Sequence, residues 1–385
     1  MRFCLVSTQE HWGGGEALLC SIAQQLQQAG HAVSWIARRD SEVIERIQRD
    51  GAEVLHELYK RGTNLRDWFA TRRSLRKWVP DVLLLNDTHA VPLAGSVAWF
   101  CRRPRPLRLA YKHTVFPLRS GLKYRLLSDK LICVSAAAQE TVVAGGLPRE
   151  HTAVVYGGCP LPVESRHARE RIRRELQLTP EQKLLVCVGN LLDCKGHAEL
   201  VAAAQVLHNN PSRVGRGLET KYSEFVIVIA GEGAERERLT QRINDAQLTH
   251  CVRLLGYRND AEQLLAAADL VVHPSHAEGL SLVLIQAQML AKPIVATAVG
   301  GAAEVLQSSN VQACTSWIAE PKNAFHLAQQ ITSALACLES EPDLLARRLQ
   351  ETKRHACEKF DIGVNAHLLV ELSASNLAYS DSSDL

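Results

Sequence analysis

The 385-residue sequence lacks several features that would place it in a special class. It has no apolar run near the roughly 18 residues that span a bilayer, and residues 1–7 are strand-like rather than a signal peptide. Its 11 cysteines are scattered, without a C-x-x-C pair or a close His/Cys cluster. This distribution favours buried free thiols over disulfides or zinc. We therefore expect a cytoplasmic protein without a metal site.

The composition is that of a folded protein, with 46% hydrophobic and 22% charged residues. A chain of this length usually forms two domains, because single cores stop growing near about 250–300 residues. Charge is distributed unevenly along the chain. The net charge is only +3, yet residues 60–130 hold 16 Lys and Arg against 4 Asp and Glu. One half of the protein is therefore distinctly basic.

Short apolar runs rich in β-formers alternate with helical patterns, which is typical of βαβ units and parallel sheets. The first half predicts strands at residues 3–6, 33–36, 52–55, 82–85, 107–110, 131–134 and 152–155. The second half predicts strands at 183–189, 225–230, 252–255, 270–273, 293–297 and 315–318, with a polar surface loop at 209–223. The pattern predicts an α/β protein with two Rossmann-like, doubly wound domains.

The alternating pattern lapses at residues 157–166, where two glycines and two prolines disfavour both strand and helix. We therefore predict an N-terminal domain at 1–158 and a C-terminal domain at 159–360. A helix at 361–377 is expected to cross back to the first domain, and 378–385 to form a frayed tail. Two such domains facing one another leave a cleft at the carboxyl edges of their sheets, where ligands bind.

A glycine-rich turn, Gly13-Gly14-Gly15-Glu16, follows the first predicted strand and opens a helix. Backbone N–H groups at such a helix N-terminus suit an anion, although a plain flexible turn explains the glycines equally well. The third glycine of a G-x-G-x-x-G fingerprint is missing, which counts against a dinucleotide. No cofactor is therefore expected.

The second half carries a more specific series of motifs. It reads VGNLLDCKG (188–196), AGEG (230–233), LLGYRND (254–260), AADLVVHPS (267–275), EGLSLVLIQAQMLAKPIVAT (278–297) and VGGAAEV (299–305). In this order and spacing the motifs resemble glycosyltransferase family 4, the retaining GT-B enzymes also called glycosyl transferases group 1. GGGEALLCSIAQQLQQAGHAV and SDKLICVSAAAQETVVAGG in the first half agree with it. The resemblance implies a GT-B fold, with an acceptor-binding N-terminal domain and a donor-binding C-terminal domain.

The chemistry of a nucleotide-sugar donor explains several of these residues. Breaking its glycosidic bond adds negative charge to the departing diphosphate, which then needs positive charge or N–H donors. Lys195 matches the family lysine that contacts the diphosphate, although a solvated loop lysine is the simpler structural interpretation. The loop at 277–280 precedes a helix whose N-terminus can bind the same group, so a metal is dispensable. Glu278 matches the family glutamate near the donor hexose.

Three positions depart from the family pattern. Gln286 replaces a second glutamate at the ribose hydroxyls, and Asn190 stands where many members have an arginine toward the diphosphate. Gly157-Gly158 replaces an Asn-Gly pair. We expect the donor-binding residues to be Gly14, Gly15, Asn190, Gly233, Tyr257, Gly279, Leu280, Ser281 and Gln286, and the catalytic residues to be Glu278, Lys195 and His113.

Histidines and the basic region leave alternatives open. His113 matches the family's cleft histidine near donor sugar and acceptor, but it also fits a structural loop histidine, and His89 is a second candidate. His273 and His276 are better explained as a strand end and turn than as a metal pair. The basic region suits anionic lipid or an anionic acceptor, or is merely a solvated face. No nucleic-acid motif accompanies it.

These features predict a retaining, metal-independent hexosyltransferase with a UDP- or GDP-sugar donor. Its acceptor is expected to be anionic or lipid-linked, in the synthesis of lipopolysaccharide, polysaccharide or glycolipid. The cytoplasmic enzyme would be peripheral on the inner face of the membrane if the basic region binds lipid. Two alternatives are a catalytically impaired sugar-nucleotide-binding or accessory protein, which the three departures favour, and a GT-B-fold sugar-nucleotide epimerase.

Overall fold

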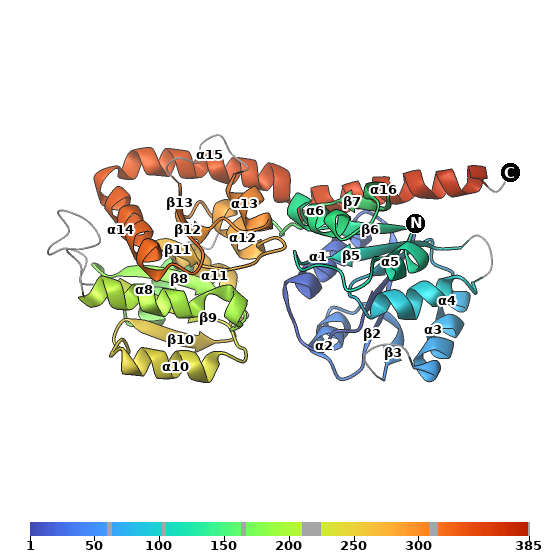
Figure 1. Ribbon diagram of the computed structural model, residues 1–385, viewed down its shortest axis with the longest axis horizontal. Coiled ribbons are helices and arrows are strands. Elements are labelled where there is room, and N and C mark those ends of the chain that lie inside the picture. Colours follow the sequence, from blue (N-terminus) through green and yellow to red (C-terminus); the bar gives the residue numbers. More distant parts are fainter. Residues whose placement is uncertain (60–63, 102–104, 163–166, 210–224, 308–314, 384–385) are drawn as a thin grey trace. The chain divides into compact units, whose positions relative to one another are not determined.

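The computed structural model describes the chain except for residues 60–63, 102–104, 163–166, 210–224, 308–314 and 384–385. Most of the surface loop expected at 209–223 and the last part of the expected linker therefore lie outside the described residues. The chain divides into two compact units (Figure 1). Unit 1 comprises Met1–Pro160 with Phe360–Leu385, and unit 2 comprises Leu161–Lys359.

Unit 1 is built on a parallel seven-stranded sheet with the order β3-β2-β1-β4-β5-β6-β7. Its strands are β1 (Arg2–Ser7), β2 (Ala32–Arg38), β3 (Glu53–Leu58), β4 (Val82–Leu85), β5 (Leu107–Lys112), β6 (Lys130–Cys133) and β7 (Thr152–Val154). The strand order reverses between β1 and β4. In doubly wound sheets, ligands bind at the carboxyl ends of strands flanking such a reversal.

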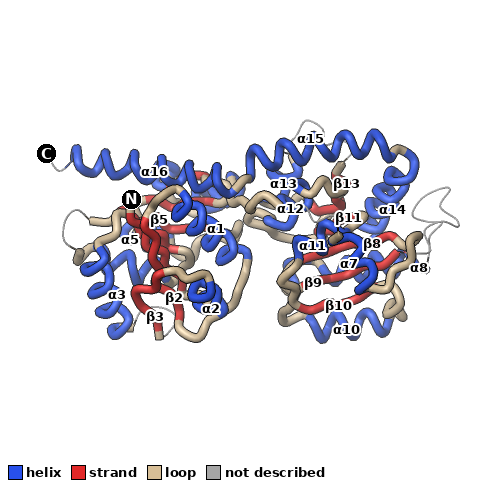
Figure 2. Tube along the Cα trace, turned by 180° about the vertical axis from the view of Figure 1, so that it is seen from behind, coloured by secondary structure: helices blue, strands red, loops and turns tan. Residues whose placement is uncertain are grey.

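Helices cover both faces of this sheet. They are α1 (Gly14–Gln28), α2 (Glu42–Arg49), α3 (Leu65–Trp78), α4 (Ser96–Ala98), α5 (Gly121–Leu127), α6 (Ala136–Ala144) and α16 (Ile362–Ser383). Figure 2 shows α1 and α2 on one face and α3 and α5 on the other. In α1, residues 18, 19, 22, 23 and 26 are buried, so the helix packs through one apolar stripe.

Unit 2 contains a parallel six-stranded sheet with the order β10-β9-β8-β11-β12-β13. Its strands are β8 (Lys183–Val188), β9 (Phe225–Ala230), β10 (Val252–Gly256), β11 (Leu270–His273), β12 (Ile294–Thr297) and β13 (Ser316–Ala319). Its helices are α7 (Ala168–Glu175), α8 (His197–Asn209), α10 (Arg236–Asp245), α11 (Ala261–Ala267), α12 (Leu282–Met289), α13 (Gly301–Leu306), α14 (Ala324–Ser340) and α15 (Pro342–Phe360). The reversal lies between β8 and β11, and the predicted pair of doubly wound domains is confirmed.

The C-terminal helix, α16, belongs to unit 1. α16 packs against α1, and the backbone of Cys159 pairs with that of Phe360 and Ile362. Gly158 lies at this junction, where a Cβ would come within 2.3 Å of the Asn365 side chain and 2.5 Å of the Phe360 carbonyl oxygen. The second residue of the Gly157-Gly158 pair is therefore required by close packing. α16 continues to Ser383, whereas a frayed tail was expected from residue 378.

Candidate functional site

Polar side chains gather around Glu278 in unit 2, beyond the carboxyl ends of β8 and β11. The Glu278 side chain is buried, and its Oε1 accepts hydrogen bonds from Lys195 Nζ at 2.6 Å and Ser275 Oγ at 2.7 Å. His273 Nε2 lies 2.9 Å from the same oxygen. The structure thus brings together Lys195 and Glu278, which lie 83 residues apart in sequence.

The Glu278 carboxyl is held in its ionised form. Burial raises its pKa, but the hydrogen bond to His273 and the positive charge of Lys195 outweigh burial and lower the pKa to about 2. An ionised carboxylate only accepts hydrogen bonds. Glu278 is therefore suited to hold hydroxyl groups or to face developing positive charge, and not to act as a proton donor at neutral pH.

Close backbone packing positions Lys195. Gly196 follows it with a φ of +67°, and a Cβ there would lie 2.0 Å from the Pro274 carbonyl oxygen. In the same contact, the His276 N–H donates to the Cys194 carbonyl oxygen at 2.8 Å. The loop after β8 is thereby pressed against the loop after β11. Only glycine permits this approach, and the approach places the lysine beside the glutamate.

Two further glycines, Gly231 and Gly233, shape the neighbouring loop. Cβ atoms at Gly231 and Gly233 would lie 1.9 Å from the Gly189 carbonyl oxygen and 2.4 Å from that of Leu191. These contacts bring the turn after β9 against the loop that carries Asn190. The Asn190 side chain is exposed, and Tyr257, which follows β10, is 51% exposed. Three of the expected donor-binding positions thus follow adjacent strands β8, β9 and β10.

The N-terminus of α12 lies next to this cluster in sequence. Ser281 caps the helix by accepting from the Leu284 N–H at 3.3 Å, and the Ser281 Oγ is also 3.2 Å from His273 Nε2. Gly279 is buried and Leu280 is half-buried. Gln286 is half-buried on the second turn of α12, so Glu278 precedes the helix and Gln286 lies inside it.

A different polar network surrounds His113 in unit 1. The Asn86 side chain donates to Glu16 Oε1 at 3.1 Å, and its Oδ1 lies 2.9 Å from His113 Nε2. Because the Asn86 amide is oriented by the acidic side chain, its oxygen faces the imidazole, so His113 Nε2 carries the proton. The ring stacks on Tyr111 with centroids 5.4 Å apart. Gly15 lies against it, since a Cβ would be 3.2 Å from the imidazole.

The glycine-rich turn is followed by a buried acid, Glu16, at the start of α1. Burial is the main influence on the pKa of this carboxyl, and backbone groups of Gly13 and Glu16 oppose it. The side chain is 9% exposed, and burial raises its pKa. Anion binding at Gly14 and Gly15 stays a prediction.

His113 is held neutral, and His89 has a structural contact. Burial lowers the pKa of His113 to about 4. The His89 backbone N–H donates to Asp87 Oδ1 at 2.9 Å, and Asp87 also binds Thr8 through its backbone N–H and its hydroxyl. Asp87 therefore links the end of β4 to the end of β1 through hydrogen bonds, and the same carboxylate positions the backbone of His89.

Sequence reasoning missed several members of these clusters. Asn86 and Asp87 directly follow the predicted strand at 82–85, so their position at the carboxyl edge was the available signal. Ser275 lies in the AADLVVHPS motif, which gives no local signal for its bond to Glu278. His276 Nε2 lies 3.1 Å from Glu199 Oε2, while His273 faces Glu278. Among the described residues, no group of three or more His, Cys, Asp or Glu side chains could hold a metal.

Two family models match the chain over most of its length. The model described as Glycosyl transferases group 1 matches residues 168–354, and the model described as Glycosyltransferase Family 4 matches residues 12–161. A D-inositol 3-phosphate glycosyltransferase of Corynebacterium jeikeium is 34% identical over 145 residues, covering 36% of this chain and 32% of that protein. The lipopolysaccharide glucosyltransferase WaaG of Escherichia coli is 28% identical over 171 residues, covering 44% and 41%.

The chain spans less than half the length of the curated relatives it matches. A structural comparison, in contrast, extends over both units. The crystal structure of Anabaena HepE in complex with UDP-glucose matches with a TM-score of 0.80 and 20% identity, covering 97% of this chain and 100% of that one. This likeness shows the fold. The chain therefore has the GT-B fold, and the two family models together establish that it belongs to glycosyltransferase family 4.

Proposed function

We propose that the protein is a retaining glycosyltransferase that moves a hexose from a UDP- or GDP-sugar to an acceptor. The observation that carries this proposal is the Lys195–Glu278 pair, in which a half-buried lysine contacts a buried glutamate that precedes the capped N-terminus of α12. It combines a cation, a fixed carboxylate and backbone N–H donors in one unit. The names of the relatives, several of which are glycosyltransferases, support the same reaction class.

Lys195 and the start of α12 would stabilise the leaving group. As the bond between the anomeric carbon and the phosphate oxygen breaks, charge accumulates on the nucleotide diphosphate. The lysine ammonium and the N–H groups at the helix N-terminus supply positive potential without a metal. Because Lys195 is paired with Glu278 at 2.6 Å, it is already in place before the donor arrives.

Glu278 would bind the hexose. Its carboxylate is ionised and can accept hydrogen bonds from sugar hydroxyls while facing the positive charge that develops at the anomeric carbon. The acceptor oxygen bonds to that carbon on the face that the diphosphate leaves, which retains the configuration. The acceptor proton passes to the departing phosphate oxygen, so no protein nucleophile is required. Gln286 would hold the ribose hydroxyls.

His113 would act near the donor sugar in its neutral form. Its Nε2–H is directed to Asn86, and its pKa of about 4 keeps the ring uncharged at neutral pH. A neutral ring does not repel the positive charge of the reacting sugar. Glu16 and Asn86 are positioning residues in this scheme, because they fix the tautomer and orientation of the imidazole.

The departures at Asn190 and Gln286 favour a second candidate, a sugar-nucleotide-binding protein with impaired catalysis. Losing an arginine at Asn190 would cost about 2–3 kcal/mol of leaving-group stabilisation, or roughly a hundredfold in rate. Replacing a charged acceptor by Gln286 would cost about 1 kcal/mol of donor binding. Both costs leave the Lys195–Glu278 pair intact, so we favour the active enzyme.

A panel of UDP- and GDP-sugars distinguishes these candidates. Donor binding is measured by thermal shift, since a ligand of the native state raises apparent stability, and turnover by release of the nucleotide diphosphate. The anomeric configuration of the product is read by proton NMR. Binding of a donor without turnover of any donor would support the impaired protein, inversion at the anomeric carbon would refute the retaining mechanism, and conversion of a UDP-sugar without an acceptor would indicate an epimerase.

For the acceptor we propose an anionic or lipid-linked sugar chain of the kind used in envelope polysaccharide or glycolipid synthesis. The support is the excess of cations at residues 60–130, which suits either an anionic acceptor or an anionic lipid surface. A cytoplasmic enzyme would then work at the inner face of the membrane. Among the parts of the chain that the structure describes, no helix is long and apolar enough to cross a bilayer.

A further inference from the structure

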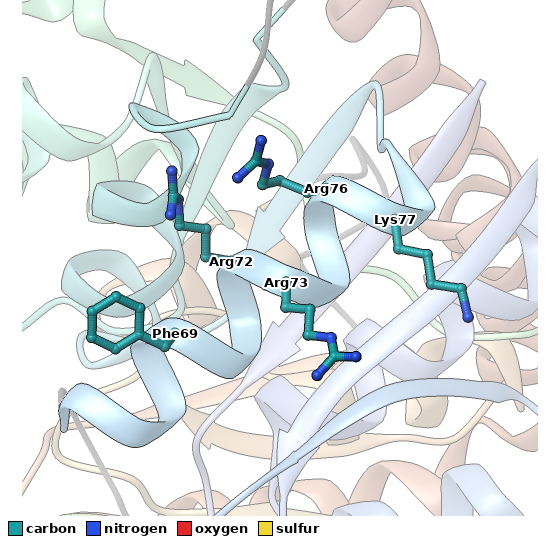
Figure 3. Close-up of a pocket in the computed structure, with 5 residues that line it drawn as sticks. All are labelled: Phe69, Arg72, Arg73, Arg76 and Lys77. Atoms are coloured by element: carbon teal, nitrogen blue, oxygen red, sulfur yellow. The ribbon is translucent and has the colours of Figure 1, made fainter.

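One side of α3 presents apolar and basic side chains outward. We define the α3 face as Leu65, Phe69, Arg72, Arg73, Arg76 and Lys77. Leu65 is 77% exposed and Phe69 is 59% exposed, and these two follow each other at a spacing of four residues. Figure 3 shows two rows of cations beyond them, Arg72 with Arg76 and Arg73 with Lys77. With Phe69 these cations line a hollow of about 370 Å³.

The opposite side of the helix attaches it to unit 1. Asp67, Thr71 and Leu75, spaced by four residues, are buried. Asp67 accepts hydrogen bonds from the Tyr59 backbone N–H and from the side-chain amide of Asn64, the N-cap residue of α3. These contacts fix the rotation of α3, so the outward position of the α3 face follows from the packing of the fold.

Each acid of this basic region has a partner away from the α3 face. The Asp67 side chain is fully buried, and Asp81 accepts from the Arg2 backbone N–H at 2.7 Å. Asp87 is buried against Thr8, and Asp129 pairs with Arg108 at 2.6 Å. These are the 4 acids counted between residues 60 and 130. None of them forms an ion pair with a cation of the α3 face among the described residues.

The cations of the α3 face have few partners within the protein. In the described chain, no acidic side chain forms an ion pair with Arg72, Arg73, Arg76 or Lys77. Arg72 also has a buried Nε without a hydrogen-bond partner among the described residues. The charge is thus available to an external anion. A face that was only a solvated helix surface would be expected to mix both signs of charge.

Exposed aromatic side chains lie beside the α3 face. Phe69 and Phe100 both contact the Trp68 ring edge-on, with centroids 5.1 Å and 5.4 Å from it. Phe100 is 55% exposed, and the adjacent Trp99 is 43% exposed. The Trp68 indole N–H is bound to Ser96 Oγ. α3 and the end of α4 therefore hold a rigid group of apolar side chains next to the cations.

We propose that the α3 face, with Trp99 and Phe100, docks unit 1 onto a lipid bilayer that contains anionic headgroups. The cations match the headgroup charge, and the exposed Leu65, Phe69 and Phe100 gain by entering the boundary between headgroups and acyl chains. A soluble polyanion would satisfy the cations but leave these apolar side chains in water. The docking deepens the membrane location proposed above by naming the surface that makes the contact, and it does not depend on sugar transfer.

The test is sedimentation of the full chain with vesicles of phosphatidylcholine alone or with about a third phosphatidylglycerol. We expect binding at least about tenfold tighter to the anionic vesicles at about 0.05 M salt, and weaker binding at about 0.5 M salt. Arg73→Gln with Arg76→Gln should weaken it about 25-fold, from roughly fivefold per cation. The matched control is Arg238→Gln with Arg354→Gln in unit 2, whose side chains are 56% and 75% exposed. This control changes net charge equally and should retain binding.

A further variant separates the bilayer from a soluble polyanion. Phe69→Ser should weaken vesicle binding several-fold and leave binding to heparin unchanged. Equal binding to both kinds of vesicle, equal losses in the α3 and control variants, or an unaffected Phe69→Ser would each overturn the proposal. The last result, with heparin binding lost in the arginine variant, would instead identify a soluble polyanion. These experiments measure binding to vesicles and heparin and not sugar transfer. A protein that binds vesicles as expected but transfers no sugar would therefore refute only the proposed function.

Discussion

The two units use the same topology to hold opposite electrostatic arrangements. In unit 2, Glu278 is ionised because Lys195 and His273 surround its carboxylate, and its pKa falls to about 2. In unit 1, burial dominates, so the pKa of Glu16 rises and that of His113 falls to about 4. Each cluster lies beyond strands that flank a reversal of strand order. The sheet edge thus fixes where a site forms, and the balance between burial and neighbouring charges decides in which direction the pKa of each group shifts.

The largest effect is expected when the ionic cluster loses its cation. Lys195→Ala should lower turnover roughly a hundredfold, because the departing diphosphate loses a positioned positive charge. The measurement is the rate of nucleotide diphosphate release at saturating donor, with folding checked by circular dichroism. Arg354→Ala removes one exposed cation from α15 of the same unit and should leave the rate unchanged. A wild-type rate in Lys195→Ala would remove this residue from the site.

Gly196→Ala tests whether backbone contact positions the lysine. The new Cβ would meet the Pro274 carbonyl oxygen at 2.0 Å, so the loop must move away and separate Lys195 from Glu278. We expect turnover to fall about tenfold and unfolding free energy to fall by about 2–4 kcal/mol. Gly51→Ala is the matched control, since its φ is +71° but nothing lies within 4 Å. It should lose only the roughly 1–2 kcal/mol of left-handed backbone strain.

Acid titration separates Glu278 from His113 by pH window. The folded pKa of Glu278 is below its ordinary 4.5, so its stabilisation is present above about pH 4.5 and is lost as pH falls toward 2. The folded pKa of His113 is also below its ordinary 6.5. The unfolded chain therefore binds more protons between about pH 6.5 and 4, and stability is lost across that earlier window as pH falls.

Single substitutions should each reduce the pH dependence of the free energy of unfolding in one of these two windows. His113→Gln should reduce the slope of unfolding free energy between about pH 6.5 and 4, and Glu278→Gln the slope below about 4.5, each by up to the order of 3 kcal/mol in total. The measurement is chemical denaturation at a series of pH values. His367→Gln, with a side chain 72% exposed, should change neither slope. Slopes that respond to both variants in the same window would contradict the comparison.

Sequence patterns predicted the sheet edges well and the polar partners poorly. Strand runs and motif glycines located the loops of Lys195, Glu278 and His113, because periodicity and tight turns are local properties. The bond between Asn86 and Glu16 joins residues 70 apart, and it depends on register between β1 and β4 that no local pattern encodes.

The smallest effect is expected where the chain departs from its family without touching either cluster. Gln286→Glu should tighten donor binding about fivefold, since a carboxylate accepts ribose hydroxyls roughly 1 kcal/mol better than an amide. Turnover at saturating donor should stay within about twofold, because ribose contacts are equal in the ground and transition states. The measurement is the dissociation constant of the nucleotide diphosphate. The neighbouring Gln288 cannot serve as a control position, because its side chain is buried and donates to the Val305 carbonyl oxygen. Gln329→Glu on α14, at a half-buried position, is the better control. If Gln286→Glu weakens binding instead, the half-buried amide is matched to its own surroundings, and the ionic character of unit 2 is confined to the Lys195–Glu278 pair.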